Sequence, residues 1–342
     1  MSADRVSSVI GILFNILMSD ELVQHPADTE DPYRAVFIGM LNTKNKPKKK
    51  CTAMTRYQYV EIPNPPLTLA GRIYRGSAVY PAPVVILCHG FCGIQEILLP
   101  AFAQAFADAG FCAVTFDYRG FGGSEGEPGR LVPAAQVEDV LAVIEWVKRQ
   151  PQFDAERIGL WGTSLGGCHA ISAAAGNTDV KCVVSQLPFA DGESLITGEM
   201  GEDEKQKFLS SLEAMQQKKE ATGRELFVPI PKVMSDSESR AFFNKHKDDF
   251  PQLNVKIPYL TVREMLNYKP INAAGRVTQP TLVVAAELDE VNPPSQALEL
   301  YEALAGDKDF YLVSQAKHYD LYEGKVFSEV ISRQVEWFRR FL

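Results

Sequence analysis

Short apolar runs alternate with segments in which apolar residues recur every three or four positions along most of the chain. The runs are typical of strands buried on both faces of a sheet, and the recurring spacing predicts helices packed against that sheet. The predicted buried strands lie at 82–90, 111–120, 157–162, 180–188, 280–289 and 309–318. The predicted helices lie at 96–110, 133–150, 164–176, 295–306 and 326–342. This alternation predicts an α/β protein with a mostly parallel, twisted sheet flanked by helices.

Two segments ahead of these runs follow a different pattern. Residues 54–62 and 67–76 alternate polar with apolar side chains, and the sequence Pro-Asn-Pro-Pro at 63–66 separates them. Alternation with a period of two predicts half-buried strands, and the short connection predicts that they pair antiparallel.

The stretch 188–276 interrupts the alternation. It carries the charge clusters GEDEKQK and NKHKDDF, a helical pattern over 207–223, several prolines and no apolar run long enough for a buried strand. We therefore predict a helical lid over 188–276, inserted into a core formed by residues 53–187 and 277–342.

Residues 1–52 precede the regular pattern and are predicted to form a helical extension. The apolar segment 6–18 is too short to span a bilayer, and no small-residue cleavage site follows it. We interpret it as an amphipathic or buried helix, with an anchor or partner-binding segment as the alternative. The basic run 44–50 is expected to be a solvated loop, with a docking patch as the alternative. The helices predicted for residues 1–52, or those of the lid, could form a homodimer interface.

Composition narrows the class of protein. The 342 residues include 46% hydrophobic and 23% charged residues, which suits a soluble globular core, and the net charge of −8 argues against nucleic acid as a partner. The six cysteines do not form a disulfide framework or a C-x-x-C pair, so neither a zinc site nor a redox motif is expected. No glycine-rich dinucleotide-binding motif stands at the start of a predicted helix. We therefore expect no cofactor, and we also expect no metal. The expected location is the cytoplasm.

The motif Gly-x-Ser-x-Gly at 162–166 falls where a predicted strand gives way to a predicted helix. In a parallel sheet, ligands gather at the carboxyl ends of the strands, and a serine in this tight turn is exposed there. Gly162 and Gly166 leave room for the strained turn and for the close approach of strand and helix. The sequence therefore predicts that Ser164 is a nucleophile on an elbow; a simple helix-start serine is the alternative.

A serine needs a base, and the base needs an orienting acid. Of the five histidines, His318 lies at the end of the last predicted strand, at the same edge of the sheet as Ser164, so we predict that it is the base. The acid is expected between serine and histidine in chain order. Asp289, at the exit of the strand 280–289, is the predicted acid, and Glu287 is the alternative.

Backbone amides are predicted to bind the oxygen that becomes negatively charged during acyl transfer. The amide of Leu165, directly after the nucleophile, is one predicted donor. The second is the amide of Phe91, in the loop after the strand 82–90, with Cys92 as the alternative if the loop is shifted by one residue.

These motifs resemble those of the α/β-hydrolase superfamily. The resemblance rests on CHGFCGIQE, FDYRGFGGSEGEP, GLWGTSLGG, PTLVVAAELDEVNPP and AKHYDLYEG, and covers residues 55–187 and 277–342. It is most similar to the branch of dienelactone hydrolases and Xaa-Pro dipeptidyl peptidases, which includes esterases and polyketide hydrolases and transferases. The resemblance implies an α/β-hydrolase fold and a triad of Ser164, His318 and Asp289. Peptidase relatives carry a tyrosine as oxyanion donor where this chain has Phe91, which weakens the peptidase interpretation.

The resulting hypothesis is a serine hydrolase that cleaves a carboxylic ester or thioester of a bulky, partly apolar small molecule through an acyl-enzyme. The main alternative is an acyltransferase or carbon–carbon bond hydrolase that uses the same triad. A peptidase and a non-catalytic binder on a hydrolase scaffold are further alternatives. The aromatic residues of the lid are expected either to line an apolar chamber over Ser164 or to form the core of the lid itself: Phe227, Phe242, Phe243, Phe250 and Tyr259.

Overall fold

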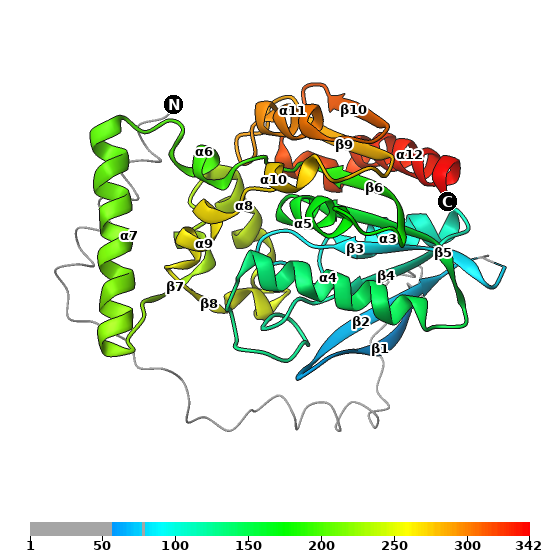
Figure 1. Cartoon of the computed structure of the whole chain (residues 1–342), viewed down its shortest axis with the longest axis horizontal. Coiled ribbons are helices and arrows are strands. Elements are labelled where there is room, and N and C mark those ends of the chain that lie inside the picture. The colour runs from blue at the N-terminus through cyan, green and yellow to red at the C-terminus, as the bar shows by residue number, and fades with distance from the viewer. Residues whose placement is uncertain (1–56, 77–78) are drawn as a thin grey trace.

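A computed structural model describes residues 57–76 and 79–342, and its centre is an eight-stranded sheet (Figure 1). The strand order is β1-β2-β4-β3-β5-β6-β9-β10. The strands are β1 Tyr57–Asn64, β2 Leu67–Arg75, β3 Ala82–Cys88, β4 Cys112–Phe116, β5 Phe153–Thr163, β6 Val180–Gln186, β9 Thr281–Ala286 and β10 Lys308–Val313. β2 pairs antiparallel with β1 and with β4, and every other neighbouring pair is parallel. The predicted mostly parallel α/β sheet is confirmed.

The central strands contain continuous apolar runs because both faces of the sheet are covered. On β3, Val84 and Ile86 belong to one buried cluster, whereas Val85 and Leu87 belong to the other. All four side chains are fully buried. A strand of this kind shows no alternation of polar and apolar residues, which is why the sequence displays it as a continuous apolar run.

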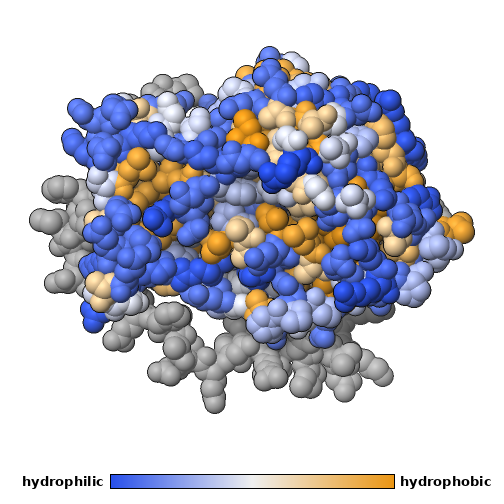
Figure 2. Space-filling view, in the orientation of Figure 1, coloured by the Kyte–Doolittle hydropathy of each residue, from blue (hydrophilic) through white to orange (hydrophobic). Residues whose placement is uncertain are grey.

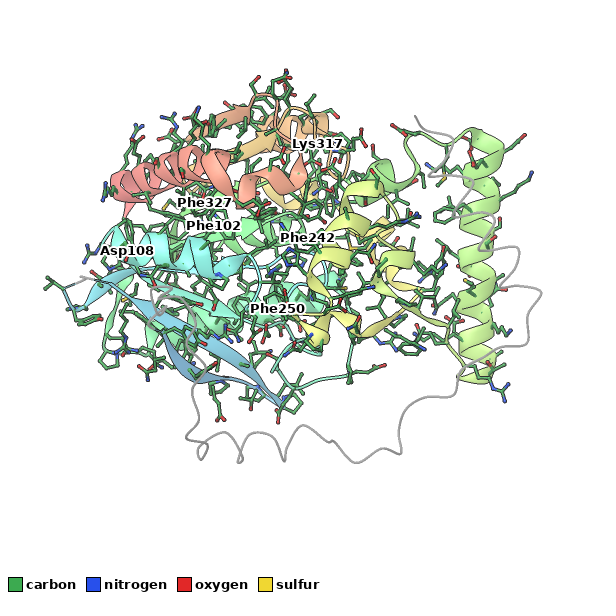
Figure 3. The ribbon with its side chains drawn as sticks, turned by 180° about the vertical axis from the view of Figure 1, so that it is seen from behind. Phe102, Asp108, Phe242, Phe250, Lys317 and Phe327 are labelled. Carbon is green, nitrogen blue, oxygen red and sulfur yellow. The ribbon has the colours of Figure 1, made fainter. Side chains whose placement is uncertain are left out.

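Helices cover the two faces of the sheet. α4 (Pro133–Lys148), α5 (Leu165–Ala174) and α11 (Pro294–Ala303) pack in one cluster. α3 (Leu99–Asp108) and α12 (Gly324–Phe341) pack in the other. Figure 3 shows this second face, where Phe102 of α3 and Phe327 of α12 lie side by side, with ring centroids 4.9 Å apart.

The last predicted strand is shorter in the structure than the sequence indicated. β10 ends at Val313, and the chain leaves the predicted strand in a turn at 314–315, because Gln315 adopts a left-handed conformation with φ of 54°. His318 then begins a 3-10 helix, η3 (His318–Tyr322). The turn brings His318 away from the strand direction and over the carboxyl edge of the sheet.

The chain between β6 and β9 forms a separate layer of helices at that edge. It contains α6 Gly192–Thr197, α7 Glu202–Thr222, η1 Ile230–Lys232, α8 Ser237–His246, η2 Pro251–Asn254, α9 Thr261–Asn267 and α10 Ile271–Ala274. It also contains a short antiparallel pair that the sequence did not indicate, β7 Phe227–Pro229 and β8 Lys256–Pro258. Three residues are too few to display a period of two. That this layer acts as a lid stays a prediction.

The long helix α7 stands at the periphery (Figure 1). Residues of α7 and α9 line a groove between the two helices. The groove has a cavity volume of about 550 Å³, and its lining includes Leu209, Leu212 and Leu266. Figure 2 shows apolar residues gathered in this hollow on an otherwise largely hydrophilic face. None of Ser164, Asp289 and His318 lines it, so the groove is separate from the site proposed from the sequence.

The predictions for residues 1–52, including the apolar segment 6–18 and the basic run 44–50, lie outside the described residues. Within the described ranges, no helix combines the length and apolar character needed to cross a membrane. The described cysteines are all free and buried: Cys88, Cys92, Cys112, Cys168 and Cys182.

Candidate active site

Ser164 occupies the sharp turn between β5 and α5. Its φ of 55° and ψ of −126° are unusual for a residue with a side chain. The turn is held by the Ser164 amide, which donates to Gln186 O at 2.8 Å, and by the amide of Gly167, which donates to Ser164 O at 2.9 Å. The strained backbone lifts the side chain to the carboxyl edge of the sheet, the geometry of a nucleophile elbow.

The two glycines of the motif allow this turn because backbone groups replace their side chains. A Cβ on Gly162 would collide with the carbonyl of Gly166, and a Cβ on Gly166 would collide with the carbonyls of Cys88 and His89. The elbow therefore packs directly on the end of β3, and the loop after β3 lies against Ser164.

His318 and Asp289 form a buried pair at the same edge. The imidazole Nδ1 donates to Asp289 Oδ2 at 2.7 Å, and both side chains are almost completely buried. The other carboxylate oxygen, Oδ1, accepts from the amides of Val291 at 2.8 Å and Asn292 at 2.7 Å. Burial alone would lower the pKa of His318, but the negative charge of Asp289 and its hydrogen bond outweigh burial and raise it. With Nδ1 protonated, Nε2 is left to accept a proton.

Glu287, the alternative acid, does not contact His318. Its carboxylate accepts from Ser314 Oγ at 2.7 Å and from the amide of Gln315 at 2.7 Å, and it is exposed. These bonds, the Gln315 amide foremost, lower the pKa of Glu287. Glu287 thus holds the turn that ends β10, and of the two acids only Asp289 lies beside the imidazole.

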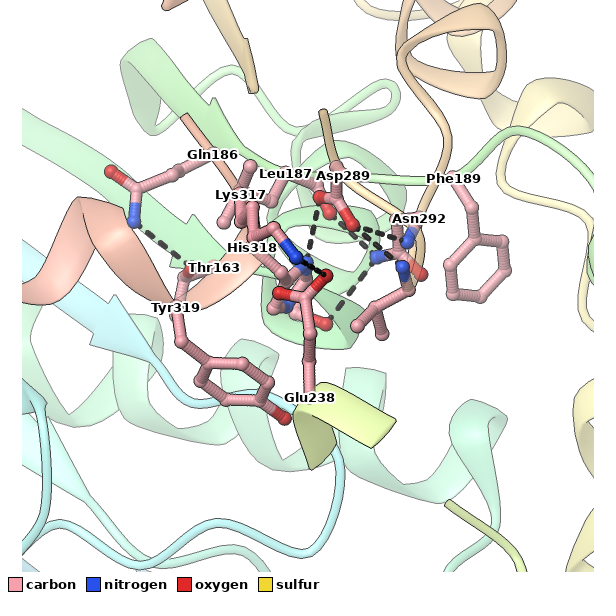
Figure 4. A network of polar contacts seen from close by, with 12 residues as sticks. Thr163, Gln186, Leu187, Phe189, Glu238, Asp289, Asn292, Lys317, His318 and Tyr319 are labelled. Carbon is pink, nitrogen blue, oxygen red and sulfur yellow. Dashed lines mark hydrogen bonds and ion pairs between the residues drawn. The ribbon is translucent and has the colours of Figure 1, made fainter. Parts of the chain in front are cut away.

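Asn292, which no sequence pattern marked as a site residue, links the turn of Ser164 to the loop of Asp289. Its Nδ2 lies 3.3 Å from Ser164 Oγ and 2.7 Å from Leu187 O, to which it donates (Figure 4). No hydrogen bond joins Ser164 Oγ to His318 directly within the part of the chain that the structure describes. The loop that carries Asp289 and Asn292 therefore bridges the two side chains. Because Asn292 donates to Ser164, the serine keeps its own proton for another acceptor.

The predicted oxyanion donors flank Ser164. A Cβ on Gly90 would lie 3.2 Å from the Cβ of Ser164, so the loop that carries Phe91 lies against Ser164. The Leu165 amide is at the first position of α5, where helix N–H groups have no acceptor within the helix. Within 57–76 and 79–342, the amides of Phe91, Cys92 and Leu165 donate no hydrogen bond. Their role stays a prediction.

A second, fully buried connection joins the histidine segment to the elbow. Tyr322, at the end of η3, hydrogen-bonds through its hydroxyl to Thr163 Oγ1 at 2.6 Å, directly before Ser164. Gln186 Nε2 donates to the same Thr163 oxygen at 3.1 Å. Gln334 of α12 donates to Gln186 Oε1 at 2.7 Å and accepts from Trp161 Nε1 at 2.8 Å. The network fixes η3 and α12 relative to the end of β5.

The remaining described histidines have structural partners. His89 Nε2 contacts Ile97 O at 2.9 Å, and burial lowers its pKa to about 4. His169 lies between Tyr268 OH at 2.9 Å and Gln136 Oε1 at 3.0 Å, and burial lowers its pKa to about 3. His246 packs against Phe242 on α8. His25 lies outside the described residues.

The inserted layer reaches the histidine segment through α8. Phe242 stacks on Tyr319 with ring centroids 4.6 Å apart, and Ser239 Oγ lies 3.1 Å from Tyr319 OH. Phe243 and Tyr259 are buried in the large cluster that the insertion shares with the sheet. The sequence left two roles open for the five aromatics of the lid. The structure places Phe242 beside η3, Phe243, Phe250 and Tyr259 in packing with the large cluster, and Phe227 against the guanidinium of Arg130.

Neither a metal nor a cofactor motif was expected from the sequence. Over the described ranges, no three histidine, cysteine or acidic side chains come together in a group able to hold a metal ion.

This chain belongs to the α/β-hydrolase family. The family model described as "alpha/beta hydrolase fold" matches residues 83–325, which include the elbow, the acid loop and His318. The narrower assignment to the dienelactone-hydrolase branch stays a prediction.

Relatives in bacteria and fungi carry several activities in their names. The chain is 53% identical to an uncharacterised 31.7 kDa protein of the traX-finO intergenic region of Escherichia coli, over 81% of this chain and 96% of that protein. It is 30% identical to thiohydrolase aneE of Aspergillus aculeatus, over 79% of this chain and 89% of that protein. It is 26% identical to polyketide transferase grgF of Penicillium, over 80% and 92%. A solved structure of GrgF superposes with a TM-score of 0.71 at 23% identity, over 84% of this chain and 99% of GrgF.

Proposed function

We propose that this protein is a serine hydrolase that cleaves an ester or thioester of a bulky, partly apolar small molecule through an acyl-enzyme. One observation carries the proposal: the loop 289–292 bonds the imidazole of His318 with its aspartate and the hydroxyl of Ser164 with its asparagine. Three side chains far apart in sequence are thereby connected at one edge of the sheet. The thiohydrolase name of a relative supports the same chemistry.

In the proposed reaction, Ser164 Oγ attacks the substrate carbonyl while His318 Nε2 takes its proton. The amides of Leu165 and Phe91 stabilise the negative oxygen of the tetrahedral intermediate. The imidazolium then gives its proton to the departing alcohol or thiol, which leaves Ser164 acylated. Water, deprotonated by His318, releases the acid. Asp289 keeps Nδ1 protonated throughout, so that Nε2 always faces the reacting atoms.

Acyl transfer to an alcohol or amine is the second candidate function. It uses the same acyl-enzyme, and the acceptor replaces water in the last step. Two observations favour it: a relative is named polyketide transferase, and Phe242 of α8 packs on the segment that carries His318, where an apolar side chain can reduce access of water.

The test measures turnover of matched acyl esters and acyl thioesters by the wild type, Ser164→Ala and the control Ser210→Ala, whose serine is exposed on α7. We expect Ser164→Ala to abolish turnover and Ser210→Ala to match the wild type. Retained turnover in Ser164→Ala would contradict the proposal. Adding alcohols and amines separates the two functions, because a transferase yields the acylated acceptor at the expense of free acid.

A further inference from the structure

Glu238, in the first turn of α8, places a carboxylate beside the histidine segment. Its Oε1 is fully buried and forms no hydrogen bond within the described residues. Its nearest cation is Lys317 Nζ at 3.9 Å, on a side chain that is half exposed. Figure 4 shows the carboxylate pointing from α8 toward Lys317 and His318. A buried acceptor without a hydrogen-bond partner is costly, so its retention here calls for a physical reason.

The inserted layer holds this carboxylate in place before any reaction occurs. Asp236, the N-cap of α8, accepts from the Ser239 amide at 2.7 Å and fixes the helix start. Phe242 and Ser239 then attach α8 to Tyr319, the neighbour of His318. The first turn of α8, which carries Glu238, is therefore attached to the segment that carries His318.

We infer that Glu238 is an electrostatic positioning residue through which the inserted layer stabilises the imidazolium of His318 during acyl transfer. The inference rests on the proposed function. In the resting state the carboxylate lacks a hydrogen bond, and the charge of Lys317, 3.9 Å away on a half-exposed side chain, is screened by solvent. It gains a second nearby positive charge when His318 takes the proton of Ser164. An anion fixed in advance adds no reorganisation cost at that moment.

The groups that face His318 agree in sign. Asp289 on the loop after β9 and, more weakly, Glu238 and Asp236 on α8 raise the pKa of His318 against the lowering effect of burial. Burial raises the pKa of Glu238, while Lys317 and His318 act in the opposite direction. The rings of Tyr319 and Tyr322 complete the surroundings of the imidazole, with centroids 5.1 and 6.4 Å away.

The test is an NMR titration of His318 in the full chain with ¹⁵N-labelled histidine, with the signal assigned by loss in His318→Ala. We expect Glu238→Gln to lower the pKa of His318 by about half a unit to one unit, because one nearby negative charge is lost. Asp236→Asn, which keeps the N-cap, should lower it in the same direction. The control Glu213→Gln removes an equal charge from α7, 3.6 Å from Arg263, and should leave it unchanged.

Activity provides the second measurement. In Glu238→Gln, kcat should fall about three- to tenfold with KM nearly constant, and the acid limb of the rate profile should move to lower pH. An unchanged His318 pKa in a folded Glu238→Gln protein would overturn the inference. Because the titration needs no turnover, it decides the role of Glu238 even if the proposed hydrolase activity fails its own test.

Discussion

Replacing Asp289 with asparagine should inactivate the protein by reversing the imidazole of His318. Oδ1 of Asp289 accepts two backbone amides, from Val291 and Asn292, and Oδ2 accepts from His318 Nδ1. An asparagine has one acceptor oxygen, and the backbone amides of Val291 and Asn292 would both donate to it. Its NH₂ group would then face Nδ1, which can accept that donor only in the tautomer protonated at Nε2. In that tautomer, Nε2 cannot take the proton of Ser164.

The structure sets the size of this effect. In the serine-protease example of the same substitution, the wrong tautomer lowers kcat about 10⁴-fold, which corresponds to about 5 kcal/mol of transition-state stabilisation. We expect a loss of similar size here, because the loop geometry leaves the asparagine no other orientation. The loop keeps both of its amide bonds, so the fold should persist, as circular dichroism can check.

The assay compares kcat/KM on an activated ester for Asp289→Asn and the control Glu287→Gln. The control removes a carboxylate of the same loop that contacts the turn after β10 rather than His318. It should retain nearly full activity, whereas Asp289→Asn should lose it. In the wild type, the acid limb of kcat/KM should lie above pH 6.5, because the histidine acts only when neutral and its pKa is raised. A folded Asp289→Asn protein that keeps a tenth of the activity would refute the tautomer argument.

Two further substitutions test how the elbow is held. Tyr322→Phe removes the 2.6 Å hydrogen bond to Thr163, which keeps its hydrogen bond from Gln186. The unfolding free energy should therefore fall by about 1 kcal/mol, and kcat should fall about tenfold with KM constant. The control Tyr74→Phe removes a buried hydroxyl that has no hydrogen-bond partner within the described residues. It should change neither the unfolding free energy nor kcat in denaturant and kinetic measurements. An equal kcat in Tyr322→Phe and Tyr74→Phe would contradict the role given to the Tyr322 bond. Gly166→Ala should lower the unfolding free energy by about 1–3 kcal/mol in urea titrations, because its Cβ meets two backbone carbonyls. The control Gly275→Ala, whose Cβ would enter open space, should leave the unfolding free energy unchanged. Equal urea midpoints for the two variants would contradict this expectation.

The sequence predicted the sheet and the order of the candidate residues because strong local signals mark them. Continuous apolar runs identify buried strands, and a serine between two glycines at a strand-to-helix junction identifies the elbow. The placement of His318 could also be predicted, since it follows the last strand. The preference for Asp289 over Glu287 rested on its place at the strand exit, and the structure puts Asp289 alone beside the imidazole.

The contributions of Asn292 and Glu238 could not be predicted in the same way. Asn292 reaches Ser164 only because the loop after β9 folds back on the carboxyl edge, and no local pattern records that path. Glu238 is one acid among many in a charged insertion, and its significance depends on how α8 packs on η3. Tertiary contacts between distant segments decide both, whereas periodicity reports only local structure.

The proposed function requires that Ser164 is the nucleophile and that His318 activates it. The most direct measurement is intact mass after incubation with a fluorophosphonate, followed by peptide mapping, for the wild type, Ser164→Ala and His318→Ala. We expect one adduct in the wild type, mapped to Ser164, and none in either variant over the same time. An adduct that maps to another residue, or that forms equally fast in His318→Ala, would contradict it.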